Sequence, residues 1–325
     1  MAINQAQEDI YLLSYRRNNV EEDRRLNSQH DAIKYAILNG RLIHPSIPAT
    51  QITSAIADLG CGTGIWLNDI AETLFADPDT ADGSYPMLVG FDINAHAFNL
   101  SPAPGVKLVK HDCTKPFDAS YHGKFDLVNM RGLAYALTPE GFCLVLENVV
   151  QLLRPGGYLQ WLETETRLFK AYPETVEISE ALKIINTERQ QRQLAPYLPH
   201  FMLRQLLPLN SGSNVFQPGG DLLTILNFNL LPGGISREGR SEEIVLNNQF
   251  SDIVLETVKL LLNPSLVHKK SQANGDSFGG EAGTGHSQLT EIQKLMDFID
   301  EAWKSGNVKM GGVFPQLIAQ KSTSL

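Results

Sequence analysis

The chain has 325 residues, which is enough to bury a sizeable core as one large α/β domain with additions or as two small domains. Its net charge of −9 would repel a phosphate backbone, and no stretch carries a dense basic stripe, which argues against a nucleic-acid partner. The three cysteines are widely spaced, which predicts neither a disulfide framework nor a bound metal. The sequence shows no secretory signal and no apolar run of about 18 residues, so we expect a cytoplasmic protein without a membrane segment.

The first predicted element is a helix over residues 20–39, which Gly40 would close as a C-terminal cap. Four of its residues recur at helical spacing and therefore share one face: Leu26, His30, Ile33 and Ile37. A histidine on such a face either sits inside a packing interface or lines a binding site, and both interpretations of His30 stay open.

Residues 54–66, Ser-Ala-Ile-Ala-Asp-Leu-Gly-Cys-Gly-Thr-Gly-Ile-Trp, read as a strand, a tight turn and the start of a helix over residues 65–75. The strand stops at Asp58, and the turn holds Gly60, Gly62 and Gly64. Glycine is needed where backbone takes a positive φ or approaches a ligand closely. A dinucleotide loop has another spacing and a P-loop needs Gly-Lys-Ser/Thr, so the alternatives are an acid-led binding loop and a purely structural turn.

Three apolar segments after this loop read as further strands: residues 87–92, 106–110 and 124–131. The first ends at Asp92, whose carboxylate can accept two hydrogen bonds from a ribose diol. The second runs into Asp112, which on its own would be a turn or cap residue. The third carries Asn129 near its end. Because ligands of parallel sheets bind beyond the carboxyl ends of the strands, we expect these side chains and the three glycines of the loop to converge on one crevice.

A helix begins after Thr138, its predicted N-cap, with Pro139 at the first helical position. Residues 154–157, Arg-Pro-Gly-Gly, stop it, and residues 158–163 read as a fifth strand. Strands that alternate with helices predict a parallel sheet covered on both faces with right-handed crossovers.

The second half of the chain is predicted to be mostly helical up to about residue 263, with helices near residues 174–195, 200–208, 222–228 and 241–262 and a strand at 230–236. Residues 269–287 are rich in glycine and serine and predict a mobile loop. A last amphipathic helix over residues 289–304 precedes an apolar segment at 311–319.

The acid-x-G-x-G-x-G loop, the two spaced acids and the Leu-Arg-Pro-Gly-Gly-Tyr pattern at 153–158 resemble class I S-adenosylmethionine-dependent methyltransferases. Residues 11–13, 25–30 and 42–47 resemble the N-terminal region of fungal secondary-metabolite methyltransferases of the LaeA-like or UMTA type. The resemblance implies a Rossmann-like α/β fold: a mostly parallel seven-stranded sheet with helices on both faces and the segment at 311–319 as its antiparallel last strand. It divides the chain into an N-terminal helical cap (1–48), a cofactor-binding core (49–165), a helical lid with a sixth strand (166–268), a flexible loop (269–287) and a last helix and strand (288–325).

The resemblance also implies that S-adenosylmethionine is the cofactor and S-adenosylhomocysteine its product. Cofactor residues would be Gln29, Asp58, Gly60, Cys61, Gly62, Gly64, Asp92, Ile93, Asp112, Cys113, Asn129 and Met130. In the family the acid at 92 holds the ribose and the acid at 112 receives the adenine amino group. The pocket for an apolar small-molecule substrate would be lined by Tyr15, His30, Arg131, Tyr135 and Phe201, with a structural ion pair as the alternative role of Arg131.

Methyl transfer from a sulfonium is an in-line displacement, so the protein mainly aims the acceptor and excludes water. A general base helps a hydroxyl acceptor more than an amine or a thiol. Glu163 and His200 are the candidate bases, and each has a structural role as cap or ion pair as its alternative.

The leading hypothesis is a methyltransferase acting on the O, N or S atom of an apolar small molecule in fungal secondary metabolism. One rival keeps the bound cofactor but catalyses a rearrangement or cyclisation without methyl transfer. A second rival is a regulatory binding protein, because the pattern also resembles a nuclear regulator of secondary metabolism. The sequence leaves open the substrate, the acceptor atom and the choice between a monomer and a homodimer.

Overall fold

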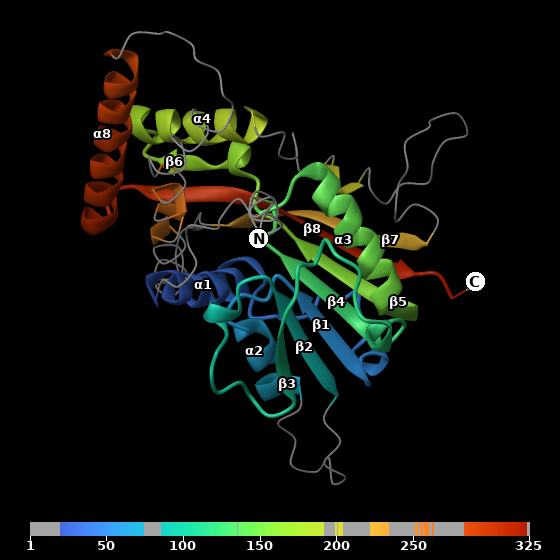
Figure 1. Cartoon of the computed structure of the whole chain (residues 1–325). Helices are drawn as coiled ribbons and strands as arrows, with labels where there is room; N and C mark the ends of the chain where they lie inside the picture. Colours follow the sequence, from blue (N-terminus) through green and yellow to red (C-terminus); the bar gives the residue numbers. More distant parts are fainter. Residues whose placement is uncertain are drawn as a thin grey trace.

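The computed structural model describes residues 20–74, 86–134, 136–191, 199, 201–203, 222–233, 251–252, 254–255, 257–259, 262 and 283–323. Eight strands in this part of the chain form one sheet in the order β3-β2-β1-β4-β5-β8-β6, with β7 also paired to β8 (Figure 1). The strands are β1 (Ala55–Leu59), β2 (Met87–Asp92), β3 (Val106–Lys110), β4 (Phe125–Arg131), β5 (Leu153–Leu162), β6 (Lys170–Tyr172), β7 (Leu223–Gly233) and β8 (Lys309–Lys321). Strands β1 to β5 are parallel, and β8 is antiparallel to β5, β6 and β7. The predicted α/β class, parallel core and antiparallel last strand are confirmed, and β6 makes one strand more than the seven expected.

The long helices are α1 (Val20–Ala32), α2 (Ile65–Leu74), α3 (Pro139–Leu152), α4 (Val176–Gln191) and α8 (Gly283–Ser305). Short turns of helix lie at Ile33–Ile37, Ala49–Gln51, Ala95–Ala97, Ala119–Tyr121 and Thr166–Leu168. The first of these, a π-helical turn, continues α1 until Asn39 and Gly40 take φ values of 52° and 76° and end it, as predicted. No helix among the described residues is long and apolar enough to cross a membrane.

Helices cover both faces of the parallel sheet. Successive residues of a strand point to opposite sides, and the two sides of β1 pack against different helices. Ala57 and Leu59 of β1 belong to the cluster that includes Phe142 and Val145 of α3. Ile56 instead belongs to the cluster that includes Trp66 of α2. Asp58 shares the parity of Ile56 and is therefore directed to the α2 side of the sheet.

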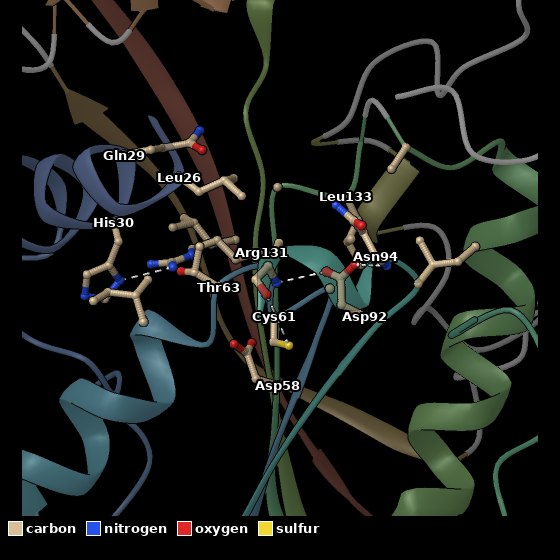
Figure 2. Close-up of a pocket in the computed structure, with 18 of the residues that line it drawn as sticks. Leu26, Gln29, His30, Asp58, Cys61, Thr63, Asp92, Asn94, Arg131 and Leu133 are labelled. Atoms are coloured by element: carbon tan, nitrogen blue, oxygen red, sulfur yellow. Dashed lines mark hydrogen bonds between the residues drawn. The ribbon is translucent and has the colours of Figure 1, made fainter. Parts of the chain in front are cut away.

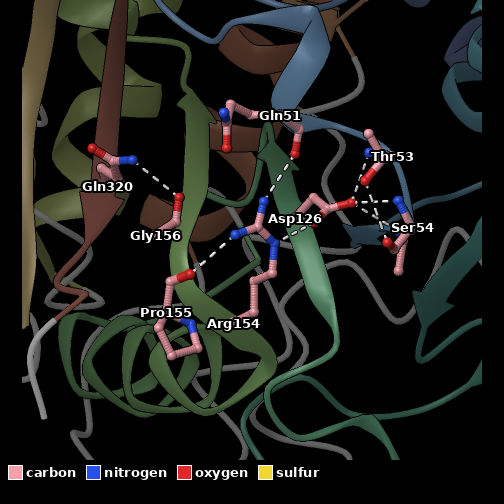
Figure 3. Close-up of polar contacts among 9 residues, drawn as sticks. Gln51, Thr53, Ser54, Asp126, Arg154, Pro155, Gly156 and Gln320 are labelled. Atoms are coloured by element: carbon pink, nitrogen blue, oxygen red, sulfur yellow. Dashed lines mark hydrogen bonds and ion pairs between the residues drawn. The ribbon is translucent and has the colours of Figure 1, made fainter.

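Asp126 of β4, which is 1% exposed, holds the end of the sheet at which strand β1 begins (Figure 3). Its Oδ2 accepts hydrogen bonds from the backbone N–H groups of Thr53, Ser54 and Ala55 at 2.9, 2.6 and 3.1 Å. Its Oδ1 pairs with Nε of Arg154, whose Nη2 donates to the carbonyl oxygen of Gln51 at 3.0 Å. One carboxylate thus ties the entry of β1 to β4 and β5.

Helix α3 starts as predicted, because the Thr138 Oγ1 accepts the Gly141 N–H at 3.2 Å and Pro139 follows the cap. Strand β5 begins at Leu153, earlier than the predicted residue 158. Leu153 already pairs with Phe125 of β4, and the register then shifts before Leu127 pairs with Tyr158. The Pro-Gly-Gly sequence therefore forms an irregular strand start instead of a separate turn.

Two predictions in the second half of the chain are wrong. Residues 222–228 were expected to be helical but lie mostly in β7, which pairs with β8 along its length. Asparagine alternates with large apolar residues from Asn227 to Leu230, a period of two that suits a strand. Helix α8 begins at Gly283, inside the predicted loop, of which residues 269–282 lie outside the described residues.

A third apolar cluster joins the later elements of the chain. It contains Ile178 of α4, Ile299 of α8 and Met310 of β8, together with Ile33 and Ile37 after α1. The predicted helix near 174–195 is confirmed by α4, whereas most of the segments near 200–208 and 241–262 lies outside the described residues. The division of the chain into cap, core and lid stays a prediction.

Candidate functional site

The carboxyl ends of β1, β2, β4 and β5, together with the segment after β3, open on one pocket, and α1 forms a further wall (Figure 2). Twelve of the predicted site residues line it: Gln29, His30, Asp58, Gly60, Cys61, Gly62, Asp92, Ile93, Asp112, Cys113, Arg131 and Glu163. Residues far apart in the sequence are brought together here because parallel strands end at the same edge of the sheet.

Four other predicted residues do not line this pocket. Asn129 lies behind Asp58, and Met130 is fully buried in the apolar core. Gly64 packs against the Leu108 side chain, and Phe201 packs on Phe142 with ring centroids 5.5 Å apart. The remaining three, Tyr15, Tyr135 and His200, lie outside the described residues.

The glycine loop has the geometry that glycine alone adopts easily. Gly60, Gly62 and Gly64 have φ values of 69°, 54° and 81°. A Cβ on Gly60 would lie 2.5 Å from Cδ2 of Leu133, so the loop also leaves no room for a side chain there. The backbone of the loop therefore forms part of the pocket surface.

Asp92 connects this loop to the end of β2. Its Oδ2 accepts the Gly62 N–H at 2.8 Å, and its Oδ1 accepts the Asn94 N–H at 2.8 Å. The Asn94 Oδ1 is itself buried without a hydrogen-bond partner among the described residues. The sequence predicted Asp92 but missed Asn94, for which its position two residues after a strand-ending acid was the available signal.

Asp112 has the local role expected of an acid at a strand end. Its Oδ1 accepts hydrogen bonds from N and Oγ1 of Thr114 at 2.9 and 2.7 Å. It also lines the pocket, beside a group of aromatic rings that includes Phe91 and His111. The turn role and a place on the pocket surface are thus compatible.

His30 and Arg131 face each other across the pocket wall (Figure 2). Nη2 of Arg131 lies 3.1 Å from Nδ1 of His30, and Nε2 of His30 lies 2.8 Å from Oδ2 of Asp69. Arginine can only donate and a carboxylate can only accept, so His30 is the neutral tautomer with its proton on Nε2. Burial, followed by the charge of Arg131, lowers the pKa of His30 to about 4, which favours the same neutral form.

Glu163 is 1% exposed and holds the segment that follows β4. Its Oε1 accepts the Leu133 N–H at 3.1 Å and the Trp161 indole N–H at 2.9 Å, and its Oε2 accepts the Ala134 N–H at 3.0 Å. Three N–H donors directed at the carboxylate fix its position. Of its two predicted roles, this arrangement supports the structural one.

We therefore expect Glu163→Gln to lower the rate of the methyl transfer that the sequence resemblance implies by less than about tenfold and to leave the shape of its pH profile unchanged, since losing a general base costs roughly a hundredfold or more. The amide nitrogen of glutamine would face a backbone N–H and loosen the segment. Initial rates across the pH range, beside thermal melting, measure both effects. A loss above a hundredfold with a flattened profile would instead identify Glu163 as the base.

Helix α1 is attached to the glycine loop by its polar side chains. The Thr63 hydroxyl donates to Oδ1 of Asn27 at 2.6 Å. Arg25 forms two hydrogen bonds with Glu22, at 2.8 and 2.7 Å, and a third with Oε1 of Gln29 at 3.2 Å. Glu22, Arg25 and Gln29 all line the pocket, so α1 presents a row of polar side chains to it.

A family model described as a methyltransferase domain matches residues 56–157. The methyltransferase grgD of a Penicillium species is 31% identical over 199 residues, which are 61% of this chain and 68% of that protein. The N-methyltransferases sirN of Leptosphaeria maculans and gliN of Aspergillus fumigatus are 34% and 31% identical, over 48% and 60% of this chain and 50% and 62% of their own lengths. The chain thus spans from 50% to 68% of the length of these relatives. With this similarity and the pocket at the carboxyl ends of its strands, the chain belongs to the class I S-adenosylmethionine-dependent methyltransferases.

Proposed function

We propose that this protein transfers a methyl group from S-adenosylmethionine to a nitrogen atom of an apolar small molecule in secondary metabolism. The observation that carries the proposal is the convergence of the glycine loop with Asp58, Asp92 and Asp112 on one pocket. A nitrogen acceptor is supported by the relatives sirN and gliN, which are named as N-methyltransferases.

The residues of the pocket suit the nucleoside part of this cofactor. The glycine loop offers backbone that a side chain would cover, since a Cβ on Gly60 collides with Leu133. Oδ1 of Asn94, which has no hydrogen-bond partner in the described part of the chain, is a buried acceptor beside Asp92, and such an atom is stabilised by a ligand donor. A carboxylate offers roughly four acceptor sites, so Asp92 is able to serve both loop amides and a ribose diol.

The charges of the pocket suit the amino-acid tail of the cofactor. Asp58 lies on one part of the wall and Arg131 on another, and no ion pair joins them within the described residues. An anionic and a cationic group in one pocket complement a zwitterion, so we assign the ammonium group to Asp58 and the carboxylate to Arg131.

When bound, S-adenosylmethionine supplies a methyl group made electrophilic by its sulfonium charge. Leu133, Leu137 and Phe314 line the same pocket and would exclude water and orient an apolar acceptor. A neutral amine attacks with its own lone pair and loses its proton after the N–C bond forms. The chemistry therefore does not require Glu163, whose oxygens hold backbone and indole N–H groups, to act as a base.

The test is incubation of the purified chain with methyl-labelled S-adenosylmethionine and matched apolar amines, alcohols and thiols. We expect the amines to become labelled, and the alcohols and thiols to become labelled at much lower rates. Preferential labelling of an alcohol or a thiol contradicts the nitrogen assignment. An isomerised product without label supports the cyclisation rival, and a stable protein partner without any turnover supports the regulatory one.

Replacing Arg131 by methionine should weaken binding of S-adenosylmethionine by about tenfold or more, since a lost bond to a charged group costs about 1.5–3 kcal/mol. Decarboxylated S-adenosylmethionine, which lacks the group assigned to Arg131 but keeps the ammonium group, should lose much less affinity, because only the effect of Arg131 on Asp58 remains. Calorimetry with the two nucleosides measures the difference. Arg41→Met, in a separate small cavity, is the matched control, and an equal loss for both nucleosides in Arg131→Met argues against the assignment.

A further inference from the structure

A row of buried polar side chains crosses the sheet behind the pocket. Asp58, Asn129 and Gln160 are neighbours on β1, β4 and β5, because the strand register pairs 58 with 129 and 129 with 160. They are only 4%, 2% and 3% exposed. Nδ2 of Asn129 donates to Oδ1 of Asp58 at 2.8 Å, and Nε2 of Gln160 donates to Oδ1 of Asn129 at 3.0 Å. Buried polar groups are as a rule hydrogen-bonded, and the three side chains of this row bond to one another.

The far end of the row is held by the backbone that follows α1. Oε1 of Gln160 accepts the His44 N–H at 2.8 Å, and Nε2 of Gln160 also donates to the Leu42 carbonyl oxygen at 3.0 Å. Turning the Gln160 amide over would set its NH₂ against the His44 N–H and its oxygen against the Leu42 oxygen. The backbone therefore fixes the Gln160 amide in one orientation.

The orientation of the Gln160 amide determines the orientation of the Asn129 amide. Gln160 presents an N–H to Asn129, so Asn129 must offer its oxygen there and its own NH₂ to Asp58. Every hydrogen bond from His44 to Asp58 consequently runs in the same direction and ends on a carboxylate oxygen.

We propose that Gln160 is a positioning residue for Asp58: it fixes the Asn129 side chain so that the Asp58 carboxylate always receives an N–H and keeps its ionised, pocket-facing form. The consequence for cofactor affinity rests on the proposed function, in which Asp58 faces the ammonium group. The residue acts from two strands away and without lining the pocket itself.

The hydrogen bond from Asn129 affects the charge state of Asp58, because Asp58 is buried. Burial raises the pKa of Asp58 to about 6, the charge of Arg131 and the hydrogen bond from Asn129 act against that rise, and the charge of Asp92 adds to it. Among the described residues the thiols of Cys61 and Cys113 also interact with Asp58, and burial raises the pKa of each, so they stay neutral. If Asn129 turned its oxygen to Asp58, protonated Asp58 would become more stable near neutral pH.

The first test uses the chain alone. Carboxyl ¹³C NMR follows the titration of Asp58, whose signal is identified by its loss in Asp58→Asn. We expect Gln160→Met to raise the titration midpoint by about one unit, the equivalent of one hydrogen bond to a charged group. Gln316→Met is the matched control, because Gln316 is 2% exposed and borders the same small cavity as Gln160 but lies outside the row. An unchanged midpoint in folded Gln160→Met overturns the proposal.

Asn129→Leu covers the case in which Gln160→Met does not fold. It removes directly the bond to Asp58 that Gln160 is proposed to hold in place, but leaves the bonds of Gln160 to Leu42 and His44 intact. The same rise in the Asp58 midpoint is expected, and its absence overturns the proposal.

The second test compares two nucleosides by calorimetry at about pH 5, below both titration midpoints, where a one-unit rise in the midpoint lowers the ionised fraction of Asp58 about tenfold. Gln160→Met should weaken S-adenosylmethionine by about tenfold but change 5′-methylthioadenosine, which lacks the amino-acid tail, by less than about twofold. An equal loss for both nucleosides means that Gln160 has only a general structural role and overturns the proposal. If the unaltered chain binds neither nucleoside, the proposed function fails, while the NMR titration still decides the role of Gln160.

Discussion

Asp92→Ala is expected to weaken binding of S-adenosylmethionine by at least about a hundredfold, because the change removes the acceptor for two backbone N–H groups and for the ligand. The Gly62 N–H and the Asn94 N–H both depend on this carboxylate, at 2.8 Å each. Its loss therefore releases the tip of the glycine loop as well as the group assigned to the ribose. Calorimetry with the cofactor and with its demethylated product measures the effect.

Asp118→Ala is the matched control for this change. Asp118 caps a similar short turn, where its Oδ1 accepts the Ser120 N–H at 2.8 Å, but it does not line the pocket. We expect the control to bind the cofactor as the unaltered chain does. A folded Asp92→Ala protein with near-normal affinity would show that the cofactor is held elsewhere.

Asp92 was predictable because its signal is local. A buried apolar strand that stops at an acid can be read without any knowledge of distant partners, and so can a loop with glycine at every second position. The same holds for the start of α3, where Thr138 and Pro139 carry the cap within two residues. Several residues that line the pocket could be predicted from such local signals.

The roles of His30 and Glu163 could not be decided in this way. Helical spacing placed His30 on an apolar face, but its tautomer depends on Asp69 and Arg131, which are 39 and 101 residues away. Glu163 bonds the backbone about 30 residues before it, at Leu133 and Ala134. Interpretations that depend on the identity of a distant partner stay open until the strands are placed side by side.

The helix predicted for residues 222–228 was wrong because the structure of this segment also depends on a distant partner. An isolated run such as Leu-Thr-Ile-Leu can form a helix or a strand, and pairing with β8 decides the matter. Gln160 is a further case, because a polar residue in the apolar strand Tyr-Leu-Gln-Trp-Leu was visible in the sequence. Only the register of β1, β4 and β5 shows that it stands in line with Asp58.

The structural role of Asp126 was not indicated by the sequence, and replacing this residue by asparagine should lower the free energy of unfolding by about 3 kcal/mol. An asparagine keeps the shape but loses the charge, and its NH₂ would face either Arg154 or the backbone N–H groups of residues 53–55. Chemical denaturation of both proteins measures the difference. Asp300→Asn, which breaks a more exposed pair with Lys259, should cost less than about 1 kcal/mol and serves as the control.

The effect of Asp126 should also depend on pH in one direction. Burial raises the pKa of Asp126, but the Arg154 hydrogen bond and the three backbone N–H groups outweigh it and hold the pKa below its ordinary value of 3.8. A carboxyl whose pKa is lower in the folded state stabilises the protein above the unfolded pKa and loses this effect as the pH falls through the folded value. The stability difference between the unaltered chain and Asp126→Asn should therefore stay constant above about pH 5 and shrink below about pH 4. A difference that persists unchanged into strong acid would mean that the shape of the side chain, and not its charge, holds the entry of β1 to β4.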